Sequence, residues 1–317
     1  MIKAISRLLR MPNLAMVFLT MYLMRWSIVR PILEITGFEP QMPESTFSLL
    51  VLSTILITAA GNVINDYHDV HADRFNRPEK VVIDRHISRR QAIILHFAFN
   101  LLGISLGIFI SFYHRLYWLS PIFIIVPIIL WFYSTIYKHK VFIGNFLISI
   151  LIATVPLLVV LFEYPLIRNA NQDILQEFPD MFNPILYWIG LFALFAFLTN
   201  LIREIIKDAE DIGGDKEVGS KTIAVVYGIK TSKIIAFILA ILTFIGLAAI
   251  FLLYLRDWMS LSYFGVFIVI PFLFLLFQIP RSLDAKGFHR LSLLIKIIML
   301  TGLTYAPIAY FVMKIVL

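Results

Sequence analysis

The sequence predicts an all-α protein that crosses a membrane about nine times. Of its 317 residues, 60% are hydrophobic and only 15% are charged, and the mean hydropathy is +0.87. A soluble globular domain carries roughly 25% charged residues. Apolar runs of about 18 residues or more, the length that crosses a bilayer core, recur along the chain. The runs are continuous rather than alternating, which indicates helices rather than the strands of a barrel.

The apolar runs form one series, and no Gly/Ser-rich linker or internal repeat divides them. The first run follows a basic segment as in a signal peptide, but it lacks a small-residue cleavage site, so we expect it to be retained. Residues 1–317 are therefore predicted to form a single transmembrane domain. We expect spans at about residues 12–33, 46–64, 92–112, 117–134, 141–162, 184–205, 232–255, 261–279 and 292–315.

The lysines and arginines predict the orientation of these spans, because cytoplasmic loops carry an excess of positive charge. Of the 27 such residues, 21 fall on one side of the predicted membrane, four on the other and two inside the first span. The richer side holds the N-terminus, so we predict a multi-pass protein of the cytoplasmic membrane whose N-terminus faces the cytoplasm. The net charge of +7 follows from this asymmetry. No nucleic-acid motif accompanies it, and we expect no nucleic-acid partner.

An acidic stretch follows the second apolar run directly. On a helix that turns by about 100° per residue, Asn62, Asp66, Asp69 and Asp73 fall within roughly 60° of one another. Three carboxylates on one stripe repel each other unless a cation lies between them. Mg²⁺ prefers oxygen ligands, usually one or two carboxylates together with the phosphates of a substrate. The stretch is therefore a candidate Mg²⁺ site at the membrane boundary, on the cytoplasmic side.

A second stretch, after the sixth apolar run, repeats this spacing of aspartates and falls on the same predicted membrane face. Carboxylates that hold metal ions, next to cations that bind phosphate oxygens, suit a metal-bound diphosphate. Such a site assists the departure of a diphosphate, because negative charge develops on that leaving group. The second stretch contains Asp208, Asp211 and Asp215, and the flanking basic residues of the two stretches are Arg74, Arg77, Lys80, Arg203 and Lys207.

Three alternatives remain open from the residues alone. A single charged loop between spans is usually just a solvated loop, although two stretches of equal spacing on one side are harder to explain in that way. A divalent-cation transporter would also use acidic residues, but its sites are expected near the bilayer midplane. Arg25, inside the first span, could either pair with an acid within the bundle or contact a substrate.

Both stretches resemble the signatures of the UbiA superfamily of intramembrane prenyltransferases, and the resemblance covers nearly the whole chain. It implies nine helices around a lipid-accessible cavity and Mg²⁺-dependent transfer of a prenyl group from its diphosphate. The chain departs from the family pattern at Val81–His86, where a turn with proline and glycine is expected. The matching residues are Asn65-Asp66, Asp69, Asp73 and Asn76-Arg77-Pro78 in the first signature, Lys207-Asp208, Asp211, Asp215 and Gly219–Thr222 in the second, and Tyr133-Ser134, Lys138 and Gly144-Asn145 in a shorter pattern.

The resemblance also implies roles for individual residues. Asp66 and Asp69 would hold one Mg²⁺, and Asp208 and Asp211 would hold the other. Asp73 and Asp215 would complete the metal sites, with Asn62 in support. The residues expected to bind substrate are Asn62, Asn65, Arg77, Lys138, Arg203, Lys207, Arg25 and Lys80.

The run from Asn200 to Asp211 is similar to the branch that transfers geranylgeranyl to geranylgeranylglyceryl phosphate. This implies a prenyl diphosphate donor and a lipophilic acceptor, in contact with membrane lipid and without an obligatory protein partner. Extra bases such as Arg25 or Lys80 could bind the acceptor's phosphate. The alternative is an aromatic quinone precursor, which would not need them.

The predicted orientation can be tested by labelling, because the chain contains no cysteine. Cysteines introduced by Lys80→Cys and Lys216→Cys should react with an impermeant thiol reagent only from the cytoplasmic side. A cysteine introduced by Asp173→Cys should react only from the other side. Labelling of the first two from opposite faces would exclude a shared site for the two aspartate stretches.

Overall fold

The computed structural model describes residues 2–316, and helices account for most of them. Within this range, nine helical segments are long and apolar enough to cross a membrane, as the sequence predicts. The bounds are α1 (Ile2–Leu8), α2 (Met11–Met24), α3 (Arg30–Ile35), α4 (Glu44–Asn76), α5 (Arg89–Tyr113), α6 (Ile122–Thr135), α7 (Ile143–Ala170), α8 (Gln172–Glu177), α9 (Asn183–Glu210), α10 (Ile212–Glu217), α11 (Ile223–Tyr254), α12 (Trp258–Phe264), α13 (Ile270–Gln278), α14 (Ala285–Leu303) and α15 (Tyr305–Val316).

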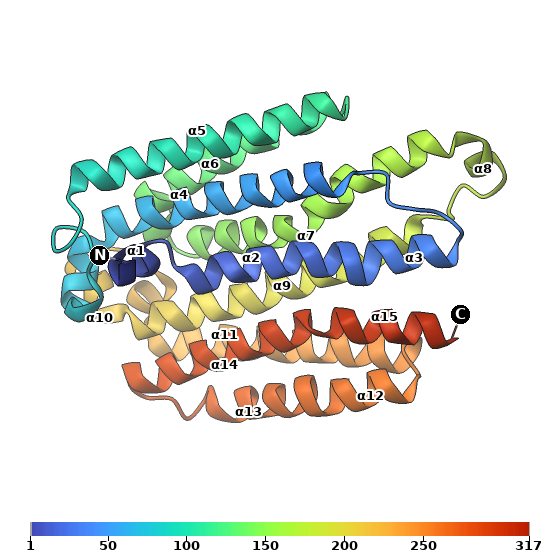
Figure 1. Ribbon diagram of the computed structural model, residues 1–317. Coiled ribbons are helices and arrows are strands. Elements are labelled where there is room, and N and C mark those ends of the chain that lie inside the picture. Colours follow the sequence, from blue (N-terminus) through green and yellow to red (C-terminus); the bar gives the residue numbers. More distant parts are fainter. Residues whose placement is uncertain (1, 317) are drawn as a thin grey trace.

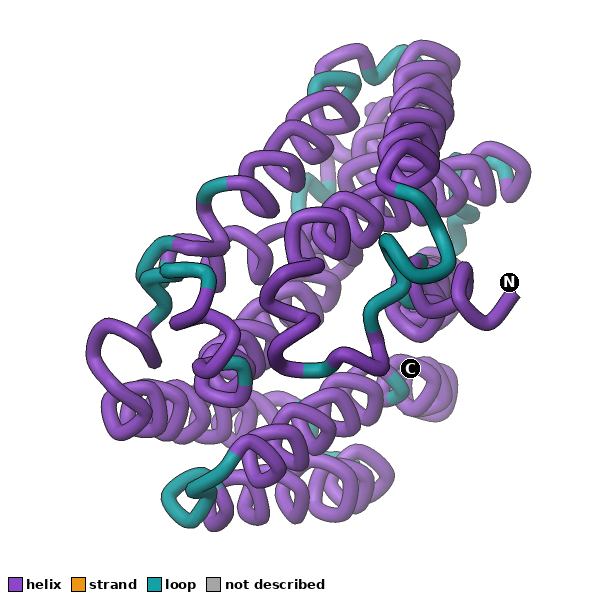
Figure 2. The backbone as a smooth tube through the Cα atoms, turned by 90° about the vertical axis from the view of Figure 1, so that its left-hand side faces the viewer, coloured by secondary structure: helices purple, strands orange, loops and turns teal. Residues whose placement is uncertain are grey.

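The long helices run side by side along one axis. Figure 1 shows α1 and α10 at one end of the bundle and α3 and α8 at the other. We call the first the acidic end, because both aspartate stretches lie there, and the second the opposite end. Figure 2 turns the acidic end toward the viewer and shows that loops are short compared with the helices. The short connections reverse the chain at each end, so consecutive spans are antiparallel.

The helix α4 carries the first aspartate stretch. The sequence predicts that its span ends near residue 64, but the helix continues to Asn76 and contains 33 residues. At about 1.5 Å per residue it is roughly 50 Å long, whereas the apolar core of a bilayer is about 30 Å thick. The last three turns therefore extend beyond the apolar run and hold Asp66, Asp69 and Asp73 on rigid helix. Pro78 follows directly, and the residue before a proline disfavours helical geometry, which ends α4.

Two of the spans contain a π-helical turn next to a proline. The turn Arg25–Val29 joins α2 to α3, and the turn Gly265–Val269 joins α12 to α13. Pro31 and Pro271 follow these turns and lack the N–H that would continue the helical bonding, so the backbone widens just before them. The span containing α11 begins nine residues before its predicted start, because a short helical piece precedes a kink at Gly228.

An ion pair lies inside the bundle at the opposite end. The guanidinium group of Arg25 is buried and contacts Glu163 of α7 at 2.8 Å and Glu44 of α4 at 3.0 Å. Glu163 is itself buried and accepts hydrogen bonds from the backbone N–H groups of Gln41 and Met42. The pair therefore ties three spans and the connecting loop together.

The segment Val81–His86, where the chain departs from the family pattern, forms a small cover at the acidic end. The side chains of Val81, Val82 and Ile83 are buried against Leu8 of α1 and Val63 of α4. Their apolar character therefore serves packing of the N-terminal helix onto α4.

The Arg25–Glu163 pair predicts a specific pattern of stability. Glu163→Leu should lower the free energy of unfolding by about 3–5 kcal/mol, because it leaves a buried guanidinium without its main partner. The double variant Arg25→Met/Glu163→Leu should recover most of this loss, since it removes both charges. Thermal unfolding in detergent measures the effect. If the double variant is no more stable than Glu163→Leu alone, uncompensated charge is not the cause.

Candidate active site

The two aspartate motifs meet at the acidic end, and Asn76 joins them. The side-chain N–H of Asn76, at the end of α4, donates to the carbonyl oxygen of Asp211 at 3.2 Å. Its side-chain oxygen accepts from the backbone N–H of Gly214 at 2.9 Å. A Cβ atom on Gly214 would lie 2.4 Å from the Asn76 amide nitrogen, so only glycine permits this approach. The Gly213-Gly214 pair of the second motif thus allows α10 to pack against the end of α4.

The aspartates of the first motif are paired with cations of the chain. Asp66 contacts Arg10 at 2.6 Å, and Asp69 forms an ion pair with Lys138. Asn65 donates to Asp69 at 2.7 Å and accepts a hydrogen bond from Lys138 at 3.4 Å. This stripe therefore presents carboxylate and amide oxygens whose charge is compensated from two other segments.

The aspartates of the second motif are held by a mixture of amide, cation and hydroxyl groups. Asp208 accepts a hydrogen bond from Asn145 of α7 at 2.8 Å. Asp211 contacts Arg77 at 2.7 Å, and Arg77 also pairs with Glu210. Asp215 accepts a hydrogen bond from Thr222 at 3.3 Å. Arg77, which follows the first motif, thus binds an acid of the second and adds a charged link to the Asn76 contact.

Lys138 lies between the two motifs. It belongs to the short 3₁₀ turn Tyr137–His139, which packs closely because Gly144 leaves no Cβ against its backbone. Its charge acts on Asp73 of the first motif and on Asp215 of the second. Burial alone would lower the pKa of Lys138, but the charge and hydrogen bond of Asp69 outweigh it and raise the pKa. The ammonium group therefore stays protonated at neutral pH.

The carboxylates concentrate negative charge where α9 gives way to α10. Burial, and then repulsion from the neighbouring Asp211, raises the pKa of Asp215 to about 6. A cation at this position would favour the ionised form, because an opposite charge nearby lowers the pKa of a carboxyl group.

The structure brings most of the predicted residues together, but two are exceptions. Arg25 pairs with Glu163 instead, which is the pairing within the bundle that the sequence left open. It lies fifteen residues after Arg10 on nearly continuous helix, about 22 Å along the axis, so we withdraw the expectation that it binds substrate. Lys80 cannot be placed, because its side chain lies outside the described part of the structure.

Other predicted residues have contacts that the sequence does not reveal. Asn62 donates to the carbonyl oxygen of Leu9 at 2.9 Å, which joins α4 to the start of the chain. Arg203 pairs with its neighbour Glu204, and the charge of Lys207 acts on both Asp69 and Asp208.

Sequence reasoning missed several residues of the site. Arg10 was assigned only to the positive charge of the N-terminus, yet it pairs with Asp66. His289 of α14 contacts Glu210 at 2.8 Å and links the last span to the site. Neither residue has a local motif, so only the packing of distant helices could identify them.

The residues present fit Mg²⁺. The ion takes oxygen ligands and is usually held by one or two carboxylates together with substrate phosphates and water. Each motif offers aspartate carboxylates, with amide oxygens beside them. The cations that now contact these carboxylates occupy the positions where positive charge is needed. Asp66 and Asp69 would hold one ion, and Asp208 and Asp211 the other.

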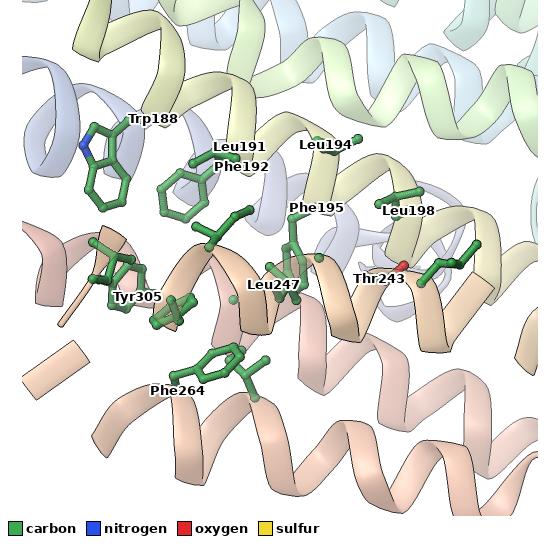
Figure 3. A pocket seen from close by; sticks show the side chains of 17 residues that line it. Trp188, Leu191, Phe192, Leu194, Phe195, Leu198, Thr243, Leu247, Phe264 and Tyr305 are labelled. Atoms are coloured by element: carbon green, nitrogen blue, oxygen red, sulfur yellow. The ribbon is translucent and has the colours of Figure 1, made fainter. Parts of the chain in front are cut away.

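A separate apolar cavity of about 130 Å³ lies between α9, α11 and the last spans. Figure 3 shows Trp188, Phe192 and Phe195 of α9 on one side and Leu247 of α11 and Phe264 on the other. The lining is almost entirely hydrocarbon and aromatic, so the cavity suits an apolar chain and not a charged group.

Comparison with known proteins agrees with this geometry. Residues 35–300 match the model of the UbiA prenyltransferase family. The chain is similar to the digeranylgeranylglyceryl phosphate synthase of Thermococcus kodakarensis, with 31% identity over 81% of this chain and 83% of that protein.

Two solved structures share the fold. One, described as part of a study of digeranylgeranylglyceryl phosphate synthase in membranes, has a TM-score of 0.63 and 23% identity, and covers 98% of each chain. The other is a UbiA homologue from Archaeoglobus fulgidus bound to GPP and Mg²⁺, with a TM-score of 0.54, 18% identity and coverage of 96% of this chain and 99% of that one. The chain therefore belongs to the UbiA prenyltransferase family and is a membrane-spanning prenyltransferase.

Proposed function

We propose that this prenyltransferase transfers a geranylgeranyl group from geranylgeranyl diphosphate to the hydroxyl group of geranylgeranylglyceryl phosphate, with Mg²⁺ as cofactor. The observation that carries the proposal is the convergence of two aspartate motifs with amides and cations at one end of a membrane-spanning bundle. The similarity to the Thermococcus kodakarensis synthase supports the choice of acceptor. The distribution of lysines and arginines supports a site on the cytoplasmic face of the cell membrane.

The chain's own residues bind and orient the donor diphosphate. Lys138, Lys207 and Arg77 offer N–H groups to its oxygens, and charge-assisted bonds of this kind are about twice as strong as neutral ones. Bound Mg²⁺ supplies additional positive charge that stabilises the departing diphosphate. Asn65 and Asn145 orient Asp69 and Asp208, so these carboxylates need little reorganisation when substrate enters.

The reaction exchanges one carbon–oxygen bond for another. The bond between the allylic carbon of the donor and its diphosphate breaks, and the electron pair leaves with the diphosphate. The acceptor hydroxyl oxygen then forms a bond to that carbon and releases its proton. The products are an ether lipid, diphosphate and one proton. The cations at the site lower the barrier because they bind the leaving group more tightly as its charge grows.

Both proposed substrates carry isoprenoid chains, which must be sheltered from water near the site. The apolar cavity beside α9 offers a place for such a chain. Its nearest lining residue on this helix, Leu198, lies ten residues before Asp208, about 15 Å along the axis. A hydrocarbon chain is long enough to cover this distance.

Purified protein with Mg²⁺, geranylgeranyl diphosphate and geranylgeranylglyceryl phosphate should yield a product with two geranylgeranyl chains, identified by mass spectrometry. Asp208→Asn and Asp69→Asn should each lower the rate at least about 10²-fold, the effect of removing one preorganised electrostatic group. The matched control is Asp173→Asn in α8, an exposed aspartate at the opposite end, which should leave the rate unchanged.

Two results would contradict the proposal in different parts. Wild-type rates in both site variants would exclude the assignment of metal ligands. Efficient transfer to an aromatic quinone precursor, without transfer to the glyceryl phosphate, would exclude the acceptor and leave the prenyltransferase activity intact.

A further inference from the structure

Two cations lie deeper in the bundle than the aspartates, on facing helices. They are Arg203 of α9 and Lys296 of α14, which we call the inner basic pair. The charges that act most strongly on Lys296 are those of Arg203, Lys207 and Arg10, all of them positive, and Glu204 is the acid that acts on it. Positive charge therefore exceeds negative charge around Lys296.

The packing of α14 on α9 explains why the inner basic pair is close. His289 of α14 contacts Glu210 of α9 at 2.8 Å, and the two helices are antiparallel. Two helical turns, or seven residues, along α14 from His289 lead to Lys296. The same two turns back along α9 from Glu210 lead to Arg203. Residues seven apart lie on one face of a helix, so the same two faces meet at both levels.

The inner basic pair has hydrogen-bonding capacity that the chain does not use. One terminal nitrogen of Arg203 contacts Glu204, but its Nε is buried and has no partner among the described residues. Lys296 is exposed on a membrane-spanning helix and takes part in none of the described ion pairs. An ionisable side chain within a membrane span is costly and marks a functional position. A buried donor without an acceptor is costly as well. An anionic ligand would satisfy both groups.

We propose that Lys296 and Arg203 bind the phosphate of a phosphorylated lipid acceptor and so select it over its uncharged alcohol. The inference rests on the proposed function. An ammonium and a guanidinium group together suit a phosphate monoester, which accepts several charge-assisted hydrogen bonds.

The position of the pair agrees with this role. Arg203 lies five residues before Asp208 on α9, about 8 Å along the axis. A phosphate held there would leave a short glyceryl unit between itself and the donor's reacting carbon at the aspartates. Lys138 and Arg77, in contrast, directly contact the aspartates and are placed to bind the donor diphosphate. The two phosphate-containing substrates would thus use separate cations.

The test compares Lys296→Met with the wild type on geranylgeranylglyceryl phosphate and on geranylgeranylglycerol, its dephosphorylated form. Lys296→Met should raise the KM for the phosphorylated acceptor about tenfold to a hundredfold, as expected for loss of one charged hydrogen bond. The KM for the alcohol and the acceptor-independent hydrolysis of the donor should not change. Lys296→Arg should keep the preference for the phosphorylated acceptor. Lys286→Met, which removes an exposed lysine from the same helix, is the matched control and should behave as the wild type.

The outcomes separate this inference from the proposed function. If the wild type transfers to the phosphorylated acceptor but Lys296→Met has an unchanged KM for it, the inference is wrong and the proposed function stands. If Lys296→Met slows donor hydrolysis as well, the lysine serves the donor and the inference is again wrong. If the wild type transfers to neither glyceryl acceptor, both fall. Retained donor hydrolysis shows that the variant is folded.

Discussion

The mutual repulsion of six aspartates at one end of the bundle is the constraint on which the rest of the structure depends. These side chains come from α4 and from the junction of α9 and α10, and no two helices would bring them together unless cations lay between them. The chain supplies Arg10, Lys138 and Arg77 for this purpose, each from a different segment. Asn76 and Gly214 add a neutral contact between the motifs.

This balance explains how the site can serve a diphosphate. The cations that neutralise the aspartates in the protein alone can turn to substrate oxygens once metal ions take their place beside the carboxylates. The same helices continue into the membrane, where the ion pair of Arg25 and Glu163 fixes the opposite end and an apolar cavity adjoins α9. Charge is thereby concentrated at one end, and hydrocarbon chains can lie along the remainder.

The sequence predicts much of the fold and the identity of the site, because hydropathy alone defines the spans and the aspartate spacing repeats. All nine spans appear within the described residues. The extension of α4 to Asn76 is missed, since helix that projects into water loses its apolar signature. Arg25 illustrates a second limit: an arginine in a span has a partner, but only packing shows that it is Glu163. The roles of Arg10, His289 and Lys296 are likewise invisible locally, because each depends on a helix distant in the chain.

The central claim is that the two motifs form one metal-dependent site. Electron paramagnetic resonance of Mn²⁺ bound in place of Mg²⁺, with an unreactive thio-diphosphate analogue of the donor, tests it most directly. The account predicts two Mn²⁺ ions per chain with magnetic coupling between them, and loss of one ion in Asp208→Asn and of the coupling with it. Two ions without coupling, or binding that is unchanged in Asp208→Asn, would contradict a single site shared by α4 and α9.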